Sequence, residues 1–521
     1  MKYEWLESAV FYQVYPTSFY DSNGDGVGDI RGIIQKLDYI KDLGVNAIWL
    51  CPCFCSPFKD GGYDITDYYN VDPRFGTNED LTELFTKAKD YNIRILLDLV
   101  LGHTSIEHPA FKASQLDEKN EFSDMFIWKP GEEPFNNNDN KFISGIAERP
   151  DMFMINYYAI QPAINYGFNK RKFKWQDKPD DHAPKKNMQR LIDICSYWLD
   201  KGCSGFRVDM AGQMVKGDPT GKGNIDFWNK AIPAVKEKFP DAVFLSEWYN
   251  PVNSVKKSSF DIDFSSEYFM YLMWTKKGFD HINRSCYLGD ESSFYTLAMK
   301  RFKKMRKVVT NKGYNAVALG NHDKIRMSHG RDQDIAKVTF AFHLLAPHLP
   351  FIYYGDEIGL PYAKIKSKDG GYRRTGSRTP MQWDNSKNRG FSTADEIYLP
   401  VDNTDLISVQ TQANDDNSLL STVKALVKLK RTYKCFRIDS GFKIIKARNG
   451  GNPLVFKRYS VDDAAYIVLF PRAEQNKLKL NFIENIDEYQ LISNNLVIKD
   501  GFIESKGKAF AVFYKTNNEN K

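Results

Sequence analysis

The feature that most constrains the fold is a set of eight short apolar runs, several of them separated by helix-length stretches. The runs are rich in β-branched and aromatic residues and cover residues 10–15, 47–51, 93–101, 205–210, 242–248, 260–264, 316–319 and 351–354. Between several of them, at 33–43, 78–91 and 187–202, apolar residues recur at spacings of three and four, the helical period. Strand and helix alternating eight times predict an α/β fold, the (β/α)8 or TIM barrel.

Two regions interrupt this alternation and predict additional domains. Residues 104–168 are rich in Asn, Asp, Pro and aromatic residues, and we expect them to form a lobe inserted after the third strand. From residue 436 to 521, strand-like runs follow one another without intervening helices, which predicts a C-terminal antiparallel β-sandwich domain. The barrel then comprises residues 1–103 and 169–435, a division that a chain of 521 residues can accommodate.

Composition excludes several classes of partner. The 72 basic and 66 acidic residues leave a formal charge of only +6, so nucleic acid is not an expected partner. No run of 18 apolar residues occurs, and acids stand where a signal peptide would be apolar. We therefore expect a cytoplasmic protein without membrane contact, a monomer or weak homo-oligomer without an organic cofactor.

The seven cysteines do not predict a disulfide framework, because their number is odd and no secretion signal precedes them. Cys51, Cys53 and Cys55 alternate along one extended segment. Neighbouring ligands on a straight strand cannot easily surround one ion, so small apolar thiols around a strand end are the favoured interpretation over a metal cluster.

Three carboxylates, Asp209, Glu247 and Asp323, each stand at the end of a short apolar run. The carboxyl ends of all strands in such a barrel face the same side, so these acids are predicted to share one cavity. Paired carboxylates are typical of glycoside transfer. An aromatic content of 14% also supplies flat faces of the kind that bind sugar rings, although core packing accounts for most of these residues.

The residues next to these acids suggest which acid is ionised and which one keeps its proton. Arg207 lies two residues before Asp209 and on a strand would face the same side, where its guanidinium would keep Asp209 ionised. An acid catalyst must instead keep its proton near neutrality, which calls for apolar or negatively charged surroundings. Phe244 and Trp248 are candidates for such surroundings near Glu247.

In their order along the chain, these motifs are similar to those of the alpha-amylase superfamily, glycoside hydrolase family 13. The similar segments are Asp98–His103, Gly205–Asp209, Glu247, Asn321–Asp323 and, at the end of the lobe, Gln161–Asn165. The resemblance implies that Asp209 is the nucleophile and Glu247 the general acid and base. It also implies that Asp323 holds the sugar hydroxyls while the ring distorts.

The same resemblance implies further substrate contacts. His103 and His322 would donate hydrogen bonds to hydroxyls of the bound glucose. The segment from Asp60 to Tyr68 resembles a loop whose tyrosine, here Tyr63, stacks under the sugar at the cleavage position. In alpha-glucosidases of the family the aspartate matching Asp60 binds the non-reducing end, which favours removal of single terminal units.

The loop after the first predicted strand carries oxygen-bearing side chains at alternate positions, the spacing by which a tight loop surrounds a hard cation. Its twelfth position is Gly32 where an EF-hand needs Glu, so it resembles instead the calcium loop of oligo-1,6-glucosidase-like members. We expect Ca²⁺, or Mg²⁺ at the same loop; a plain Asx-rich turn is the alternative. The expected ligands are the side chains of Asp21, Asn23, Asp25 and Asp29 and the carbonyl of Val27.

The chain departs from the family pattern at positions that bear on specificity. Gly102 replaces an Asn that in amylases binds a calcium between barrel and lobe, which puts that calcium in doubt. Gly212 and Gln213 stand where amylases commonly place Lys and His, so the acceptor side is not amylase-like. Met210 replaces the Val characteristic of oligo-1,6-glucosidases, so a strict preference for alpha-1,6 bonds is not indicated. The stretch Arg378–Trp383 is similar to one shared by alpha-glucosidases and trehalose synthases.

The leading hypothesis is a retaining alpha-glucoside hydrolase that releases glucose from the non-reducing end of short alpha-1,4-linked glucooligosaccharides, with alpha-1,6 links left open. One alternative is a transglycosylating or isomerising relative, of the trehalose synthase or sucrose-isomer synthase type. Another is an endo-acting alpha-amylase. From a different class, a catalytically inactive transporter subunit is disfavoured because the chain keeps its acids and shows no transmembrane run.

Overall fold

The computed structural model describes residues 3–133, 141–265, 293–309, 311–370, 374–402, 407–447 and 452–516. At its centre, eight parallel strands close a barrel in the order β1-β13-β12-β11-β10-β9-β5-β2. Their bounds are β1 Phe11–Val14, β2 Ala47–Leu50, β5 Arg94–Leu99, β9 Gly205–Val208, β10 Val243–Ser246, β11 Ile262–Phe264, β12 Tyr314–Ala318 and β13 Leu349–Tyr353. The predicted (β/α)8 barrel is confirmed.

Each of the eight predicted runs overlaps one barrel strand. The last two strands begin two residues earlier than predicted, because Asn315 and Pro350 discourage a strand when judged by local preference alone. In the closed barrel the register of β12 and β13 nevertheless pairs Val317 with Pro350 and Ala316 with Leu349. Tertiary pairing therefore extends both strands beyond what their composition indicates.

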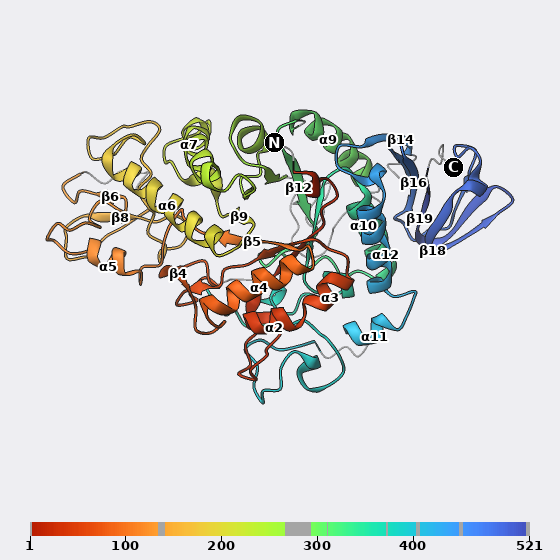
Figure 1. The fold of residues 1–521 in the computed structure, drawn as a ribbon, viewed down its shortest axis with the longest axis horizontal. Coiled ribbons are helices and arrows are strands. Elements are labelled where there is room, and N and C mark those ends of the chain that lie inside the picture. Colours follow the sequence, from red (N-terminus) through yellow and green to blue (C-terminus); the bar gives the residue numbers. More distant parts are fainter. Residues whose placement is uncertain are drawn as a thin grey trace.

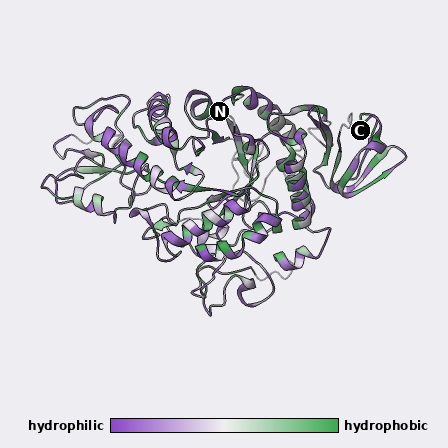
Figure 2. Cartoon of the chain, viewed as in Figure 1, coloured by the Kyte–Doolittle hydropathy of each residue, from purple (hydrophilic) through white to green (hydrophobic). Residues whose placement is uncertain are grey.

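Helices surround the barrel and show mixed hydrophobic and hydrophilic faces, whereas hydrophobic residues are concentrated on the strands (Figure 2). The predicted helix at 33–43 is divided into two short helices at Lys36, and the other two predicted helices are α4 (Asn78–Asp90) and α6 (His182–Asp200). Thr77 and Asp80 form a reciprocal capping box at the start of α4, and Ser418 caps α12 (Leu419–Thr432). The main helices are α2 Ile30–Gln35, α3 Leu37–Asp42, α4 Asn78–Asp90, α6 His182–Asp200, α7 Lys222–Lys238, α9 Ser293–Val309, α10 Gln333–Leu345 and α12 Leu419–Thr432.

Between β5 and α6 lies a small sheet in the segment predicted to be an inserted lobe. Its strands β6 (Trp128–Lys129), β8 (Met152–Met154) and β7 (Phe142–Ile143) follow that spatial order, beside α5 (Pro109–Ser114). An isolated bridge between His103 and Ala163 joins the end of this segment to the chain that leaves β5. The segment thereby reaches the carboxyl-end side of the barrel, although its predicted boundaries stay a prediction.

At the opposite end of the molecule from this small sheet lies the C-terminal antiparallel domain (Figure 1). It contains β14 Gly441–Ala447, β15 Leu454–Tyr459, β16 Asp463–Phe470, β17 Asn476–Lys479, β18 Gln490–Lys499 and β19 Phe502–Thr516. The predicted C-terminal antiparallel domain is confirmed. Its six strands are connected through β19, which is fifteen residues long and pairs with β16, β17 and β18.

Two further expectations concern cysteines and membranes. All six cysteines in the described segments are free thiols, and Cys51 accepts a hydrogen bond from Gln13 Nε2 at 3.1 Å. Among the described residues, no helix combines the length and apolar character needed to cross a bilayer.

Candidate active site

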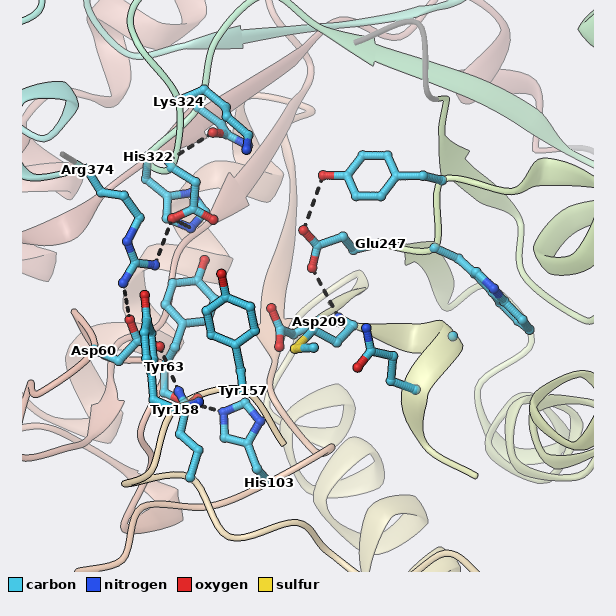
Figure 3. A pocket seen from close by; sticks show the side chains of 18 residues that line it. Asp60, Tyr63, His103, Tyr157, Tyr158, Asp209, Glu247, His322, Lys324 and Arg374 are labelled. Atoms are coloured by element: carbon cyan, nitrogen blue, oxygen red, sulfur yellow. Dashed lines mark hydrogen bonds and ion pairs between the residues drawn. The ribbon is translucent and has the colours of Figure 1, made fainter. Parts of the chain in front are cut away.

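A cavity of about 650 Å³ opens at the carboxyl-end side of the barrel. Its lining includes all three predicted catalytic carboxylates and four of the five predicted substrate contacts, while Arg207 lies buried behind it. Figure 3 shows Asp60, Arg374 and His322 on one side of the cavity and Glu247 on the other, with Asp209 between them. The lining residues are Asp60, Tyr63, His103, Tyr157, Tyr158, Gln161, Asp209, Met210, Gly212, Gln213, Glu247, Trp248, Tyr249, Asn321, His322, Asp323, Lys324 and Arg374.

Arg207, only 2% exposed, connects the two acids that the sequence analysis paired. Its Nη1 donates to Asp209 Oδ1 at 2.9 Å, and its Nη2 lies 2.7 Å from Glu247 Oε2. The predicted contact with Asp209 is present, whereas the contact with Glu247 was not foreseen. One guanidinium thus holds both carboxyl groups side by side, as a short separation between two catalytic acids requires.

Opposing influences act on the pKa of Asp209. Burial is the largest cause that raises this pKa, and the negative charge of the nearby Glu247 raises it further, while the Arg207 guanidinium lowers it. The net shift is upward, so the contact with Arg207 does not by itself keep Asp209 ionised as the sequence analysis expected.

Asp98 is a positioning residue to which the sequence analysis gave no role, although it begins one of the motifs noted there. It is buried on β5 and accepts hydrogen bonds from Arg207 Nη1 at 2.7 Å, Tyr63 Oη at 2.8 Å and Trp49 Nε1 at 2.9 Å. Burial raises the pKa of Asp98, and Arg207 opposes that effect. Asp98 therefore orients the guanidinium and the tyrosine from behind the cavity.

Arg374 is the second residue that sequence reasoning missed. Its Nη2 binds Asp60 Oδ1 at 2.5 Å, and its Nη1 binds Asp323 Oδ1 at 3.1 Å. Asp60 also accepts from Gln161 Nε2 at 2.7 Å. Arg374 stands four residues before the Arg378–Trp383 stretch, and that proximity is the one signal that could have indicated it.

Asp323 is ionised by its surroundings. Burial on its own would raise the pKa of this carboxyl, but His322, Arg374 and Arg378 together bring it well below its usual range. Arg378 Nη2 lies 3.3 Å from Asp323 Oδ1, and the side chain of Asp323 remains 30% exposed to the cavity. An exposed, permanently charged carboxylate at this place is suited to accept hydrogen bonds from sugar hydroxyls.

His322 and Tyr63 form a stacked pair below the acids. Their rings are 5.0 Å apart and nearly parallel, and Gln13 Nε2 lies 2.9 Å from His322 Nδ1. Burial is the largest cause that lowers the pKa of His322, to about 3, so the ring is neutral. With Gln13 donating to Nδ1, the proton of His322 is on Nε2, the nitrogen nearer Asp323 and the cavity.

His103 lines the cavity as predicted, but both of its ring nitrogens have protein partners. Nε2 lies 2.9 Å from the Tyr63 carbonyl oxygen, and Asn156 Nδ2 lies 3.0 Å from Nδ1. Burial lowers the pKa of His103 to about 4, so this ring is neutral as well. A sugar hydroxyl would have to share the N–H that His103 now donates to Tyr63, and the role of His103 stays a prediction.

The loop that carries Glu247 is held by Asp263, the middle residue of the short strand β11. Asp263 Oδ1 accepts from Ser246 Oγ at 2.6 Å and from the Trp248 N–H at 3.1 Å, the two neighbours of Glu247. Its Oδ2 accepts from the Asn250 N–H at 2.8 Å. Between these contacts Tyr249 adopts a left-handed φ of 56° and places its hydroxyl 3.2 Å from Glu247 Oε1. Asp263 therefore stabilises a strained turn that presents the acid.

The side chains predicted to bind a cation instead accept hydrogen bonds from N–H groups of the same loop. Asp21 accepts the N–H groups of Asn23, Gly24 and Gly26, and Asp25 accepts that of Val27. Both carboxylate oxygens of Asp29 accept hydrogen bonds, Oδ2 from the Ser22 N–H and Oδ1 from the N–H of Gly32 in the first turn of α2.

These oxygens are hard donors of the type that Ca²⁺ and Mg²⁺ prefer, but most of them already accept N–H groups. In the segments that the structure describes, no three His, Cys, Asp or Glu side chains are arranged to hold an ion. Cation binding at this loop therefore stays a prediction.

Comparison with known proteins gives a consistent result. Residues 13–439 match the alpha amylase catalytic domain. The oligo-1,6-glucosidase of Parageobacillus thermoglucosidasius is 31% identical over 493 residues, which cover 83% of this chain and 84% of that protein. The alpha-glucosidase of Candida albicans is 31% identical over 566 residues, with 95% and 96% coverage.

Among solved structures, the trehalulose synthase of Pseudomonas mesoacidophila MX-45 superposes with a TM-score of 0.83 at 24% identity. The superposition covers 99% of this chain and 100% of that one. At this identity the likeness concerns the fold alone.

Proposed function

The chain belongs to the alpha-amylase family of glycoside hydrolases, and from that premise we propose that it is a retaining alpha-glucosidase. Its proposed substrates are short glucooligosaccharides with alpha-1,4 links, from which it removes the terminal glucose at the non-reducing end. Substrates with alpha-1,6 links form a second class, which the names of the oligo-1,6-glucosidase relatives support.

The observation that carries the proposal is the bridge that Arg207 makes between Asp209 and Glu247. In a retaining mechanism, one carboxylate attacks the anomeric carbon while the other acid gives its proton to the leaving oxygen. Glu247 then takes a proton from water, and that water displaces Asp209 from the same carbon. Two displacements leave the configuration of the sugar unchanged, which is why the two acids must lie close together.

The ion pair between Asp60 and Arg374 supports cleavage at a chain end. These two side chains stand at the side of the cavity opposite Glu247 (Figure 3), and Gln161 donates a hydrogen bond to Asp60. A chain that continued beyond the bound glucose would have to displace this pair. The pair therefore opposes the endo-acting alternative, in which the substrate extends past the cleavage site in both directions.

A time course of products tests the proposal. The purified protein is incubated separately with maltose, maltotriose, isomaltose, sucrose and trehalose, and products are separated by anion-exchange chromatography. Stepwise release of glucose from maltotriose, with the alpha anomer formed first in the NMR spectrum, is the expected result. Initial release of the beta anomer would refute retention, and new disaccharides without net glucose would transfer the assignment to the isomerising alternative.

A further inference from the structure

Trp248, which directly follows Glu247, lies on the part of the cavity where the leaving sugar must sit. Glu247 protonates the oxygen that joins the terminal glucose to the next sugar, so that next sugar lies beside Glu247 and away from the Asp60–Arg374 pair. Trp248 and Gly212 both line this region of the cavity.

One face of the Trp248 indole is packed against the backbone of Gly212, in η3 (Ala211–Gln213). A Cβ atom at Gly212 would stand 2.4 Å from Nε1, 2.5 Å from Cδ1 and 2.9 Å from Cε2 of that ring. Three ring atoms at nearly equal, short distances place the face of the ring, rather than its edge, over the glycine. The φ of Gly212 lies outside the left-handed region, so the indole and not the backbone excludes a side chain here.

The indole of Trp248 is held in position by its neighbours, but its N–H makes no hydrogen bond to the described residues. Its main-chain N–H is held by Asp263, and its benzene ring lies against Gly221, where a Cβ atom would stand 3.2 Å from Cζ2. The side chain is only half-buried, and its indole N–H has no hydrogen-bond partner among the residues that the structure describes. By contrast, the indole N–H groups of Trp198 and Trp228 both donate to backbone carbonyl groups.

We infer that Trp248, seated on Gly212, is the platform on which the leaving sugar stacks, and that this pair of residues determines specificity on the acceptor side. A rigid aromatic face offers contact to the apolar face of a pyranose ring, and the free indole N–H can donate to one of its hydroxyls. The inference rests on the proposed function and deepens it. It also explains Gly212, since any larger residue at that position would displace the platform.

The test compares a substrate whose leaving group is a sugar, maltose, with one whose leaving group is not, alpha-glucosyl fluoride. For Trp248→Ala, kcat/KM on maltose is expected to fall about 30-fold more than on the fluoride, the usual size for truncation of a central aromatic contact. Trp248→Phe keeps an aromatic face and is expected to restore part of the difference. Trp5→Ala, which removes a half-buried indole that packs on Phe11, is the matched control and is expected to affect both substrates equally.

A second variant tests the coupling to the glycine without altering the tryptophan. Gly212→Ala should reproduce the selective loss on maltose, and Trp248→Ala with Gly212→Ala should lose no more than Trp248→Ala alone, because both changes remove the same platform. Equal losses on both substrates, or additive losses in the double variant, would overturn the inference. If the wild-type protein consumed neither maltose nor the fluoride, the proposed function itself would fall.

Discussion

Replacing Arg374 with alanine is expected to weaken the side of the cavity where Asp60 and Asp323 lie, which the proposed function assigns to the terminal glucose. The change removes two charge-assisted contacts, at 2.5 Å to Asp60 and at 3.1 Å to Asp323. Asp60 is only 6% exposed in its side chain, so its charge is left with little water to replace the guanidinium. The two carboxylates also repel each other, since Asp323 is one of the groups that raise the pKa of Asp60.

The size of the effect follows from these contacts. Truncating one partner of a buried, hydrogen-bonded charge pair costs about 2–5 kcal/mol. Arg378 still pairs with Asp323 at 3.3 Å, so the lower half of that range applies, about 2–3 kcal/mol. At about 1.4 kcal/mol for each factor of ten, kcat/KM on maltose should fall about 30- to 150-fold.

The assay is steady-state hydrolysis of maltose, together with product analysis on maltotriose. Arg31→Ala is the matched control, because Arg31 makes a 2.7 Å ion pair with Asp80 at the start of α4 but is 58% exposed. An exposed pair contributes about 0–1 kcal/mol, so kcat/KM of this control should stay within about five-fold of wild type. If Arg374→Ala matched the control and still released only glucose from maltotriose, the argument that this pair closes the cavity would be wrong.

Four further predictions follow from the site. Asp209→Asn and Glu247→Gln should each lower kcat by about two to four powers of ten with an unchanged circular dichroism spectrum, and near-normal turnover of either would contradict the catalytic assignment. Asp98→Asn removes a negative charge that raises the pKa of Asp209, so the pH optimum of kcat/KM should move to lower pH, and a move to higher pH would refute the coupling. Asp263→Asn loses acceptor capacity for the loop around Glu247 and should lower kcat by up to about 100-fold with little change in KM, whereas a change confined to thermal stability would deny it a positioning role. If the loop binds a cation, a chelator should lower the melting temperature of the wild type but not that of Asp25→Ala, and equal responses would argue that no ion binds there.

Much of the site was predictable because its residues follow strands. Asp209 and Glu247 come directly after β9 and β10, and strand ends in a parallel barrel meet at one face whatever the loops do. The contact between Arg207 and Asp209 followed from a spacing of two along a strand. The contact between Arg207 and Glu247 did not, because it crosses between strands and depends on the lateral register of β9 and β10.

Residues on loops were harder to predict. Arg374 binds a carboxylate 314 positions earlier in the chain, and no local pattern encodes the path by which a loop returns to the cavity. Asp263 was visible as part of a predicted strand, but its hydrogen bonds to both neighbours of Glu247 depend on the fold of the intervening turn. The glycine at 212 could be recognised as a departure from the amylase pattern, yet only the position of Trp248 explains it.

The sequence by itself determined the eight-stranded barrel, the C-terminal antiparallel domain and the acids that end the strands. The hydrophobic period and the composition that predict a strand are properties of a few neighbouring residues. Closure of a parallel barrel then brings the carboxyl ends of all its strands to one face. The tertiary structure alone decided which charges share a partner, that Arg374 pairs with both Asp60 and Asp323, and that Trp248 packs on Gly212. Such contacts join segments far apart in the chain, so they exist only after the barrel has closed and the loops have packed against its rim.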